Sequence, residues 1–312
     1  MKARRSKVYN YNSTKIDESQ EASAILKKAA IKRMYNQPII DWLYDIGEPQ
    51  KAANIAACAT YIGITNLNGY TQIVKSNFCR ERLCQICAWR RQSKFVAQMF
   101  PIIEKLSSEG YRFIECVLTI RNPDITNLKY WFNKMLEAFQ LLSKSRKIKR
   151  AWKGFTRSIE ITYNHKNNTF HPHIHMLICV DEEYFYNKNM YISQEELTQL
   201  WAEKLGIDYT PDVFIKVVSD ECVAAVENLK YSLKPSSYIE ALQVFHTILK
   251  GRRLISFNGI FAKMRKEMKY CSIDDISDDE ITVYKHKNIT YNLYKFDPSG
   301  GVYRFYETYK II

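Results

Sequence analysis

Three histidines occupy alternate positions of one apolar stretch, TFHPHIHMLICV, which runs from residue 169 to residue 180. Successive side chains of a β-strand point to opposite faces of its sheet, so His171, His173 and His175 would share one face. Both faces become apolar after His175, as in a central strand that is covered on both sides. The stretch is therefore predicted to be a central strand with a polar site at one end.

This spacing of histidines favours a metal site. Imidazoles two residues apart on one face can share a divalent cation, and two or three histidines leave coordination positions open for a substrate. Glu160, in the preceding predicted strand FTRSIEITYN, falls nearly opposite His173 if the hairpin turns around residues 166–168. A register shifted by one residue would turn Glu160 to the other face. The alternative for any single histidine is a hydrogen-bonded core or surface residue.

The charge of the chain points to a polyanionic partner. The formal net charge is +13 over 312 residues, which favours nucleic acid first and an anionic membrane surface second. The alternative is a composition rich in Lys, Ile, Asn and Tyr because the genome is AT-rich. No apolar run approaches the length of a membrane span and no secretory signal follows the basic start, so we expect a cytoplasmic protein without a membrane partner.

A predicted helix over residues 219–235 carries reactive side chains outside its apolar stripe. Glu227 and Tyr231 are neighbours on it because they are four residues apart. Beside a metal-polarised phosphodiester, Tyr231 can act as a nucleophile and Glu227 as a general base toward water. Lys230 and Lys234 are candidates for holding phosphates or stabilising developing charge. Taken singly, each of these residues is equally typical of an exposed helix face.

A cluster of cysteines predicts a second metal site. Cys79, Cys84 and Cys87 follow the pattern C-x4-C-x2-C, whose last pair has the spacing of a zinc knuckle. Cys58 is the nearest candidate for the fourth ligand, which gives a structural Zn²⁺ site with four thiolates. The alternative is four reduced thiols without metal.

Two basic segments are candidates for DNA contacts. Arginines flank the cysteine cluster and are predicted to contact DNA phosphates; they are Arg80, Arg82, Arg90 and Arg91. The run KSRKIKRAWK, residues 144–153, is predicted to clamp single-stranded DNA, with Trp152 or Tyr163 as a stacking surface. A solvated helix end is the alternative for this run.

The segments FHPHIHMLICV and ENLKYSLK together resemble the HUH endonucleases, and specifically the rolling-circle replication initiator (Rep) proteins of small plasmids from Gram-positive bacteria. The segments ECVLTIRN, FTRSIEITYN, FCRERLCQICAWRR and KGRRLISFNGIF are similar to the same branch. The resemblance implies that His173 and His175 are the metal pair, Tyr231 the nucleophile and Glu227 the hydrolytic base. His171 lies outside the minimal pair.

The resemblance implies an enzyme that starts rolling-circle replication at a plasmid origin. Such a protein nicks and rejoins one DNA strand with the help of Mn²⁺ or Mg²⁺, leaving a 5′-phosphotyrosine and a free 3′-OH. Its expected partners are the origin duplex, a single-stranded or hairpin nick site, the host helicase and polymerase, and a second copy of the chain. Two alternatives stay open: a related HUH relaxase or transposase, and a zinc-stabilised DNA-binding regulator without nuclease activity.

The order of predicted elements, strand, helix, hairpin, helix and strand, indicates an α+β fold with an antiparallel central sheet flanked by helices. The resemblance makes this fold HUH endonuclease-like, with a small zinc-binding module. We expect four parts: 1–54, a basic arm and N-terminal helices; 55–95, the zinc-binding module; 96–245, the HUH endonuclease domain; and 246–312, a C-terminal accessory region.

Overall fold

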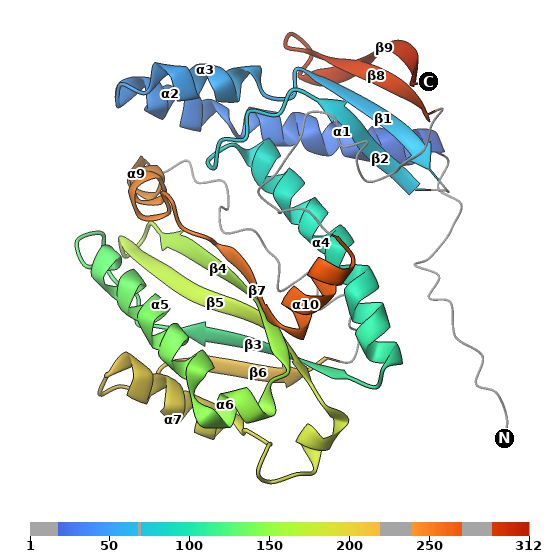
Figure 1. Ribbon diagram of the computed structural model, residues 1–312. Helices are drawn as coiled ribbons and strands as arrows, with labels where there is room; N and C mark the ends of the chain where they lie inside the picture. Colours follow the sequence, from blue (N-terminus) through green and yellow to red (C-terminus); the bar gives the residue numbers. More distant parts are fainter. Residues whose placement is uncertain (1–17, 68–69, 219–238, 270–288, 312) are drawn as a thin grey trace, which may run out of the picture.

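Two antiparallel sheets organise the chain (Figure 1). The computed structural model describes residues 18–67, 70–218, 239–269 and 289–311. The larger sheet has the strand order β6-β3-β5-β4-β7. Its strands are β3 (Arg112–Thr119), β4 (Gly154–Asn164), β5 (Thr169–Val180), β6 (Val213–Val217) and β7 (Ile255–Gly259). The prediction of an α+β fold with an antiparallel sheet and a central histidine strand is confirmed, because β5 is the middle strand of the five.

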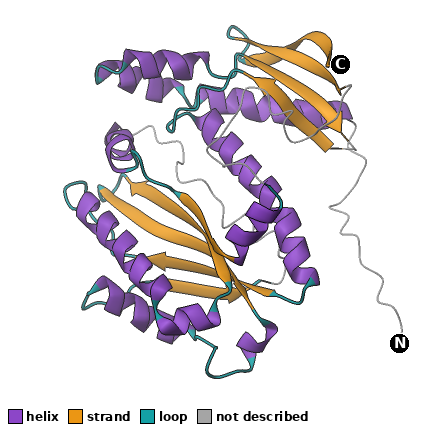
Figure 2. Cartoon of the chain, in the orientation of Figure 1, coloured by secondary structure: helices purple, strands orange, loops and turns teal. Residues whose placement is uncertain are grey.

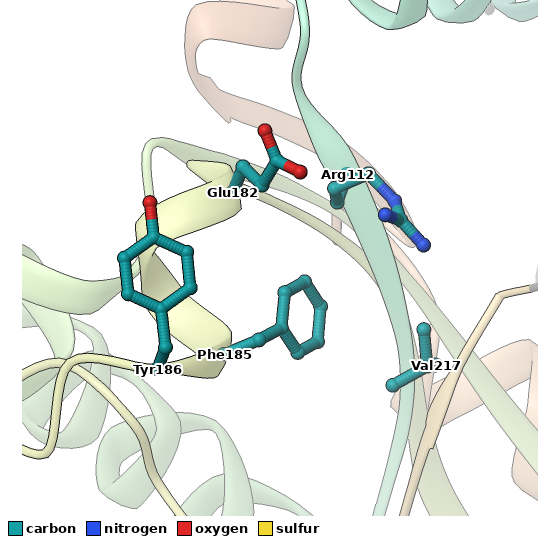
Figure 3. A pocket seen from close by; sticks show the side chains of 5 residues that line it. All are labelled: Arg112, Glu182, Phe185, Tyr186 and Val217. Carbon is teal, nitrogen blue, oxygen red and sulfur yellow. The ribbon is translucent and has the colours of Figure 1, made fainter.

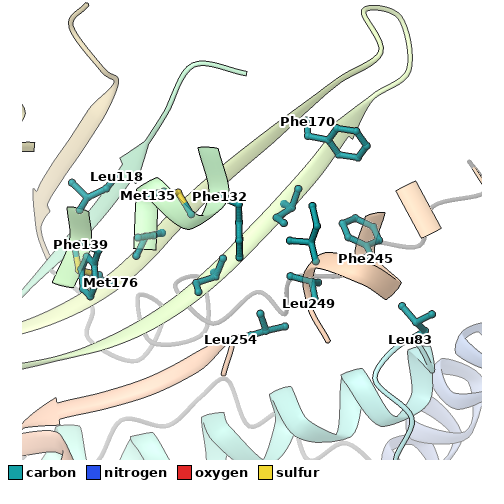
Figure 4. Close-up of a cluster of buried hydrophobic side chains, with 14 of the residues drawn as sticks. Leu83, Leu118, Phe132, Met135, Phe139, Phe170, Met176, Phe245, Leu249 and Leu254 are labelled. Atoms are coloured by element: carbon teal, nitrogen blue, oxygen red, sulfur yellow. The ribbon is translucent and has the colours of Figure 1, made fainter. Parts of the chain in front are cut away.

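Helices cover both faces of the larger sheet (Figure 2). One face packs against α5 (Leu128–Lys144), α6 (Arg146–Ala151) and α7 (Gln194–Leu205), and the other packs against α4 (Gln85–Ser108) and α10 (Ile260–Glu267). Strand alternation divides β5 between the two cores. Met176 belongs to the core that also contains Phe139 of α5 (Figure 4), whereas Leu177 belongs to the core under α4 and α10. His173 and His175 therefore lie on the face that α4 and α10 cover, because they alternate in step with Leu177.

The smaller sheet pairs two strands from the first quarter of the chain with two strands from its C-terminal part. Its strand order is β2-β1-β8-β9, with β1 (Tyr61–Leu67), β2 (Tyr70–Ser76), β8 (Ile289–Asp297) and β9 (Val302–Ile311). Ile62 of β1 pairs with Tyr294 of β8. Helix α1 (Glu18–Met34) packs against β1, β2 and β9, whereas α2 (Gln37–Asp45) and α3 (Pro49–Ala57) pack against each other. Figure 1 shows α4 running from this sheet to the larger one.

The strand pairing crosses the predicted domain boundaries. The region 246–312 is divided, since β7 extends the larger sheet while β8 and β9 extend the smaller one. The boundary at 95 also falls inside α4, a continuous helix from Gln85 to Ser108. The physical reason is that an isolated two-stranded ribbon such as β1–β2 is marginal in water and needs further strands to bury a face.

Local signals set several helix ends. Ser193 caps α7, because its side chain accepts a hydrogen bond from the Glu196 N–H, and Gly206 ends the helix with φ of +61°. The predicted N-terminal helical stretch is broken between α1 and α2, where Pro38 occupies the first turn of α2. Two further helices are α9 (Ile239–Ile248) and the 3-10 helix η1 (Glu182–Phe185). No helix in the described ranges is long and apolar enough to cross a membrane.

The turn from β7 into α10 depends on Gly259. Its φ is +56°, and a Cβ there would lie 2.2 Å from the Lys153 carbonyl oxygen and 2.7 Å from Gly154 Cα. Gly259→Ala should therefore destabilise the protein by about 3 kcal/mol, since backbone strain and a backbone clash add. Gly251→Ala is the matched control, because Gly251 also has positive φ but open space around it. Denaturant unfolding measures both; equal losses would contradict the clash.

Candidate active site and metal centres

The β4–β5 hairpin brings the predicted metal ligands together. Glu160 pairs with His173, and Ser158 pairs with His175. The turn lies between Asn164 and Thr169, so the register predicted from a hairpin around residues 166–168 is confirmed. A shift of one residue, which would have turned Glu160 away, is absent from this strand pair.

The three side chains converge on one point. The Oε2 atom of Glu160 lies 3.3 Å from His173 Nε2 and 3.2 Å from His175 Nε2. His173 Nδ1 donates to the His171 carbonyl oxygen at 3.0 Å, which orients the ring so that Nε2 is the nitrogen that faces Glu160. Two imidazole nitrogens and one carboxylate oxygen fit a divalent cation with open coordination positions.

Burial makes a cation at this point favourable. Glu160 is 2% exposed and His173 is 8% exposed, and an ionised carboxylate in the interior needs a compensating charge. Thr119 pairs with His173 on the β3 side and is also buried. The side chains thus form a small polar site at the end of an otherwise apolar sheet face.

His171 lies outside this group of three. Its ring centroid is 4.9 Å from that of His173, and its Nδ1–H donates to Asn122 Oδ1 at 2.6 Å. Burial and then the neighbouring His173 lower the pKa of His171. Its role as a ligand stays a prediction, since the structure places it beside His173 but outside the group formed by Glu160, His173 and His175. Asn122 was not expected at the site; its only sequence signal is the Asn-Pro-Asp turn after β3.

The predicted catalytic side chains lie in residues 219–238, outside the described part of the chain. The set comprises Tyr231, Glu227, Lys230 and Lys234. Their roles therefore stay predictions. The structure describes the metal-ligand candidates Glu160, His173 and His175, but none of these four side chains.

The open cavity in Figure 3 is separate from this site. It measures about 210 Å³ and is lined by Arg112, Glu182, Phe185, Tyr186 and Val217. Arg112 begins β3, whereas Thr119, beside the histidines, ends it. The cavity therefore lies at the opposite end of the sheet.

The four predicted cysteines form a second cluster. Cys58 follows α3, Cys79 lies after β2, and Cys84 and Cys87 begin α4. All four Sγ atoms lie within 4.8 Å of one another, and Cys87 Sγ is 3.6 Å from those of Cys58 and Cys79. Thiolates about 2.3 Å from one zinc ion would lie about 3.8 Å apart. The spacing fits a four-thiolate zinc site and is too long for a disulfide of about 2.05 Å.

Nearby N–H groups support thiolates at this cluster. The Cys79 N–H donates to Cys58 Sγ at 3.4 Å, and the Arg80 N–H donates to Cys87 Sγ at 3.3 Å. Hydrogen bonds with Cys79, Cys84 and Cys87, and then burial, raise the pKa of the Cys58 thiol. Four such thiols cannot all ionise without a cation among them, because the like charges would repel. The donor set therefore fits Zn²⁺.

Asn36 completes the surroundings of the cluster. It is 1% exposed, its Nδ2 donates to Cys84 Sγ at 3.5 Å, and its Oδ1 accepts from the Gln85 N–H at 2.8 Å. The sequence carries no signal for Asn36 at this site, because a lone asparagine between two helices is not part of a motif.

The arginines beside the cluster bind the protein's own carbonyl oxygens. Arg82 donates to the Arg252 carbonyl, Arg90 to that of Ile73, and Arg91 to those of Arg80 and Glu81. Arg91 is 3% exposed, and burial lowers the pKa of Arg90 to about 10. These contacts give Arg82, Arg90 and Arg91 a structural role, and their contact with DNA phosphates stays a prediction.

The basic run 144–153 is also partly engaged within the fold. Lys147 pairs with Glu196, and Lys153 pairs with Asp181. Trp152 is 6% exposed and packs against Phe155. The prediction that Trp152 offers a stacking surface is therefore wrong, because its ring is part of the core.

Tyr163 lies on β4, paired with Phe170 on the face of the hairpin opposite the ligand side chains. Its ring packs against Phe170 with centroids 4.9 Å apart, and its hydroxyl donates to Asn168 Oδ1 at 2.9 Å. It is half-buried, so its role as a stacking surface stays a prediction.

Several known proteins similar to this chain are named Protein rep, and the matching family model is described as a replication protein. The family model Rep_1, described as a replication protein, matches residues 70–300. A Protein rep from a Bacillus species is 33% identical and the match covers 78% of this chain and 88% of that protein. A Protein rep from Bacillus amyloliquefaciens is 34% identical, covering 72% and 75%, and one from Streptococcus pneumoniae serotype 2 is 31% identical, covering 67% and 68%. No solved structure matches significantly. The resemblance is confirmed, and the chain belongs to the Rep family of replication proteins.

Proposed function

We propose that this replication protein nicks and rejoins one DNA strand at a plasmid origin and so starts rolling-circle replication. The observation that carries the proposal is the convergence of Glu160, His173 and His175 at the end of the β4–β5 hairpin. Family membership supports the replication context, and the net charge of +13 suits a DNA partner. The protein would bind the origin duplex and a single-stranded or hairpin nick site in the cytoplasm, work with host helicase and polymerase, and form a homodimer.

In this proposal the chain supplies both the metal ligands and the nucleophile. His173, His175 and Glu160 would hold Mn²⁺ or Mg²⁺, which supplies a Lewis acid for the scissile phosphate. The Tyr231 hydroxyl oxygen forms a bond to phosphorus as the bond from phosphorus to the 3′ oxygen breaks. The tyrosine proton leaves with this step and the 3′ oxygen ends as a hydroxyl. The 5′-phosphotyrosine then keeps the energy needed to rejoin strands.

The segment predicted to carry Tyr231 would also supply the later steps. Glu227 accepts a proton from water so that water can release the DNA from Tyr231. Lys230 and Lys234 hold phosphates or stabilise the charge that develops on them. A glutamate near the tyrosine would let the protein end a round of replication by hydrolysis.

The test is an adduct assay with labelled single-stranded oligonucleotides tiled across the DNA around the gene. With Mn²⁺, wild-type protein should form a covalent protein–DNA band, whereas Tyr231→Phe or added EDTA should remove it, because the attacking oxygen or the cation is lost. Tyr163→Phe is the control, as it removes a tyrosine hydroxyl on the face of β4 opposite the ligands and keeps the ring. Metal-independent binding without any adduct, on oligonucleotides shown to bind, would favour the zinc-stabilised regulator instead.

A further inference from the structure

The loop over residues 249–254 lies between the cysteine cluster and the strand that carries Glu160. Arg82 stands in the segment between Cys79 and Cys84. Its Nη1 donates to the Arg252 carbonyl oxygen at 2.6 Å and reaches that of Leu249 at 3.5 Å. These carbonyls follow the C-terminal end of α9, where a cation is favourable because the helix dipole leaves partial negative charge there.

The same loop is bonded to β4 on its other side. The Ile159 N–H donates to the Leu254 carbonyl oxygen at 3.0 Å, and Arg157 Nη2 donates to that of Arg253 at 3.4 Å. Ile159 directly precedes Glu160 in the chain. Only the short loop therefore separates the Arg82 guanidinium from the backbone that holds the candidate metal-binding carboxylate.

The contacts around the loop make it a stiff connection. Arg252 Nη2 donates to Asn133 Oδ1 of α5 at 2.6 Å, and its guanidinium lies over the Phe132 ring. Leu249 is buried in the core that also contains Leu83, the residue after Arg82 (Figure 4). Displacement at Arg82 is thus transmitted to packed and hydrogen-bonded groups, since a close-packed interior has few voids that could absorb it.

The N-terminal helices hold α9 from a second direction. The ring of Trp42 in α2 meets that of His246 edge-on with centroids 5.5 Å apart, and His246 Nε2 lies 3.7 Å from a Glu48 carboxylate oxygen. The N-terminal helices therefore contact α9, and Arg82 contacts the loop that follows it.

We propose that Arg82 is a positioning residue, which ties the cysteine cluster to β4 and so fixes Glu160 for metal binding. This role rests on the proposed function in one respect, that the site at Glu160 performs nicking. Arg82 touches neither the metal site nor, in this role, the DNA. Its effect passes through the carbonyls of the 249–254 loop.

The test compares Arg82→Ala and Arg82→Lys with the wild type. Arg82→Ala should lower the rate of adduct formation about tenfold at saturating DNA, the scale of contacts that support metal ligands, and should weaken Mn²⁺ binding. The KM for the oligonucleotide and the zinc content should stay unchanged. Arg82→Lys should recover part of the rate, since a lysine keeps the charge but reaches fewer carbonyls.

Hydrogen exchange provides a readout that does not depend on activity. Amides of residues 249–259 and of β4 should exchange faster in Arg82→Ala, whereas Lys27→Ala, which removes an exposed cation from α1, should leave them unchanged. A weaker DNA affinity with an unchanged rate and unchanged exchange would overturn the proposal and make Arg82 a phosphate contact. If the wild type forms no adduct, nicking fails as the function, and exchange together with Mn²⁺ binding still decides the role of Arg82.

Discussion

Alanine in place of His173 should lower the rate of adduct formation about 100-fold or more and should abolish tight Mn²⁺ binding. The loss would be large because a Lewis acid at a phosphodiester contributes several kcal/mol to transition-state stabilisation. His173 Nε2 is one of three ligand atoms that converge at the site, and its Nδ1 bond to the His171 carbonyl aims that atom at Glu160. Without it, two ligands remain and the buried carboxylate loses a compensating group.

His171→Ala is the matched control for this substitution. It removes an imidazole on the same strand face but keeps the backbone carbonyl that His173 uses. Its rate should stay within about tenfold of the wild type, the scale of contacts outside the ligand shell. Mn²⁺ affinity by isothermal titration and adduct formation by gel measure both variants. If His171→Ala lost the metal as completely as His173→Ala, His171 would be a ligand. Its ring would then have to leave Asn122 and join Glu160, His173 and His175 when the metal binds.

The site was predictable from sequence where local rules determine the geometry. Strand alternation sets the common face of His173 and His175, and a short hairpin turn sets the position of Glu160 opposite them. The cysteine cluster was predictable for a similar reason, because the spacing of Cys84 and Cys87 in one helical turn brings two sulfurs together.

Long-range pairing was beyond such rules. Thr65 and Thr290, whose contact joins β1 to β8, are 225 residues apart in the chain. Nothing local in the β8 sequence distinguishes pairing with β1 from pairing with another strand. The predicted division at residue 246 therefore followed the order of the sequence, whereas the fold places β7 in one sheet and β8 in the other.

The roles of basic and aromatic residues were also undetermined by composition. A guanidinium binds a phosphate and a carbonyl oxygen with the same donors, so Arg82 and Arg91 carry no sequence signal that separates the two partners. Likewise Trp152 lies within a basic run but is buried against Phe155. Only the packing of the surrounding helices and strands decides which of these side chains remain available to DNA.

Loss of the cysteine cluster should have the largest effect on stability. Cys87→Ala should remove bound zinc and lower the Tm by roughly 10 °C or more. Structural zinc contributes on the order of 10 kcal/mol in small zinc domains, and each 1 kcal/mol of lost stability shifts the Tm of a protein of a few hundred residues by about 2–4 °C. Cys87 Sγ lies 3.6 Å from two of the other sulfurs, so no three-ligand arrangement of the same geometry survives its loss.

Cys116→Ala is the matched control, since Cys116 is equally buried but lies in β3, away from the cluster. Its cost should be about 1 kcal/mol, from a small cavity. Thermal unfolding and zinc content by elemental analysis measure both variants. Purified wild-type protein with four reduced thiols, no zinc and a Tm that chelators do not change would contradict the metal site.

Because Arg82 lies between two of these cysteines, removal of zinc by a chelator should also accelerate hydrogen exchange at residues 249–259 in the wild type. Arg82→Ala should already show most of that acceleration. This result would link the structural metal to the strand that carries Glu160.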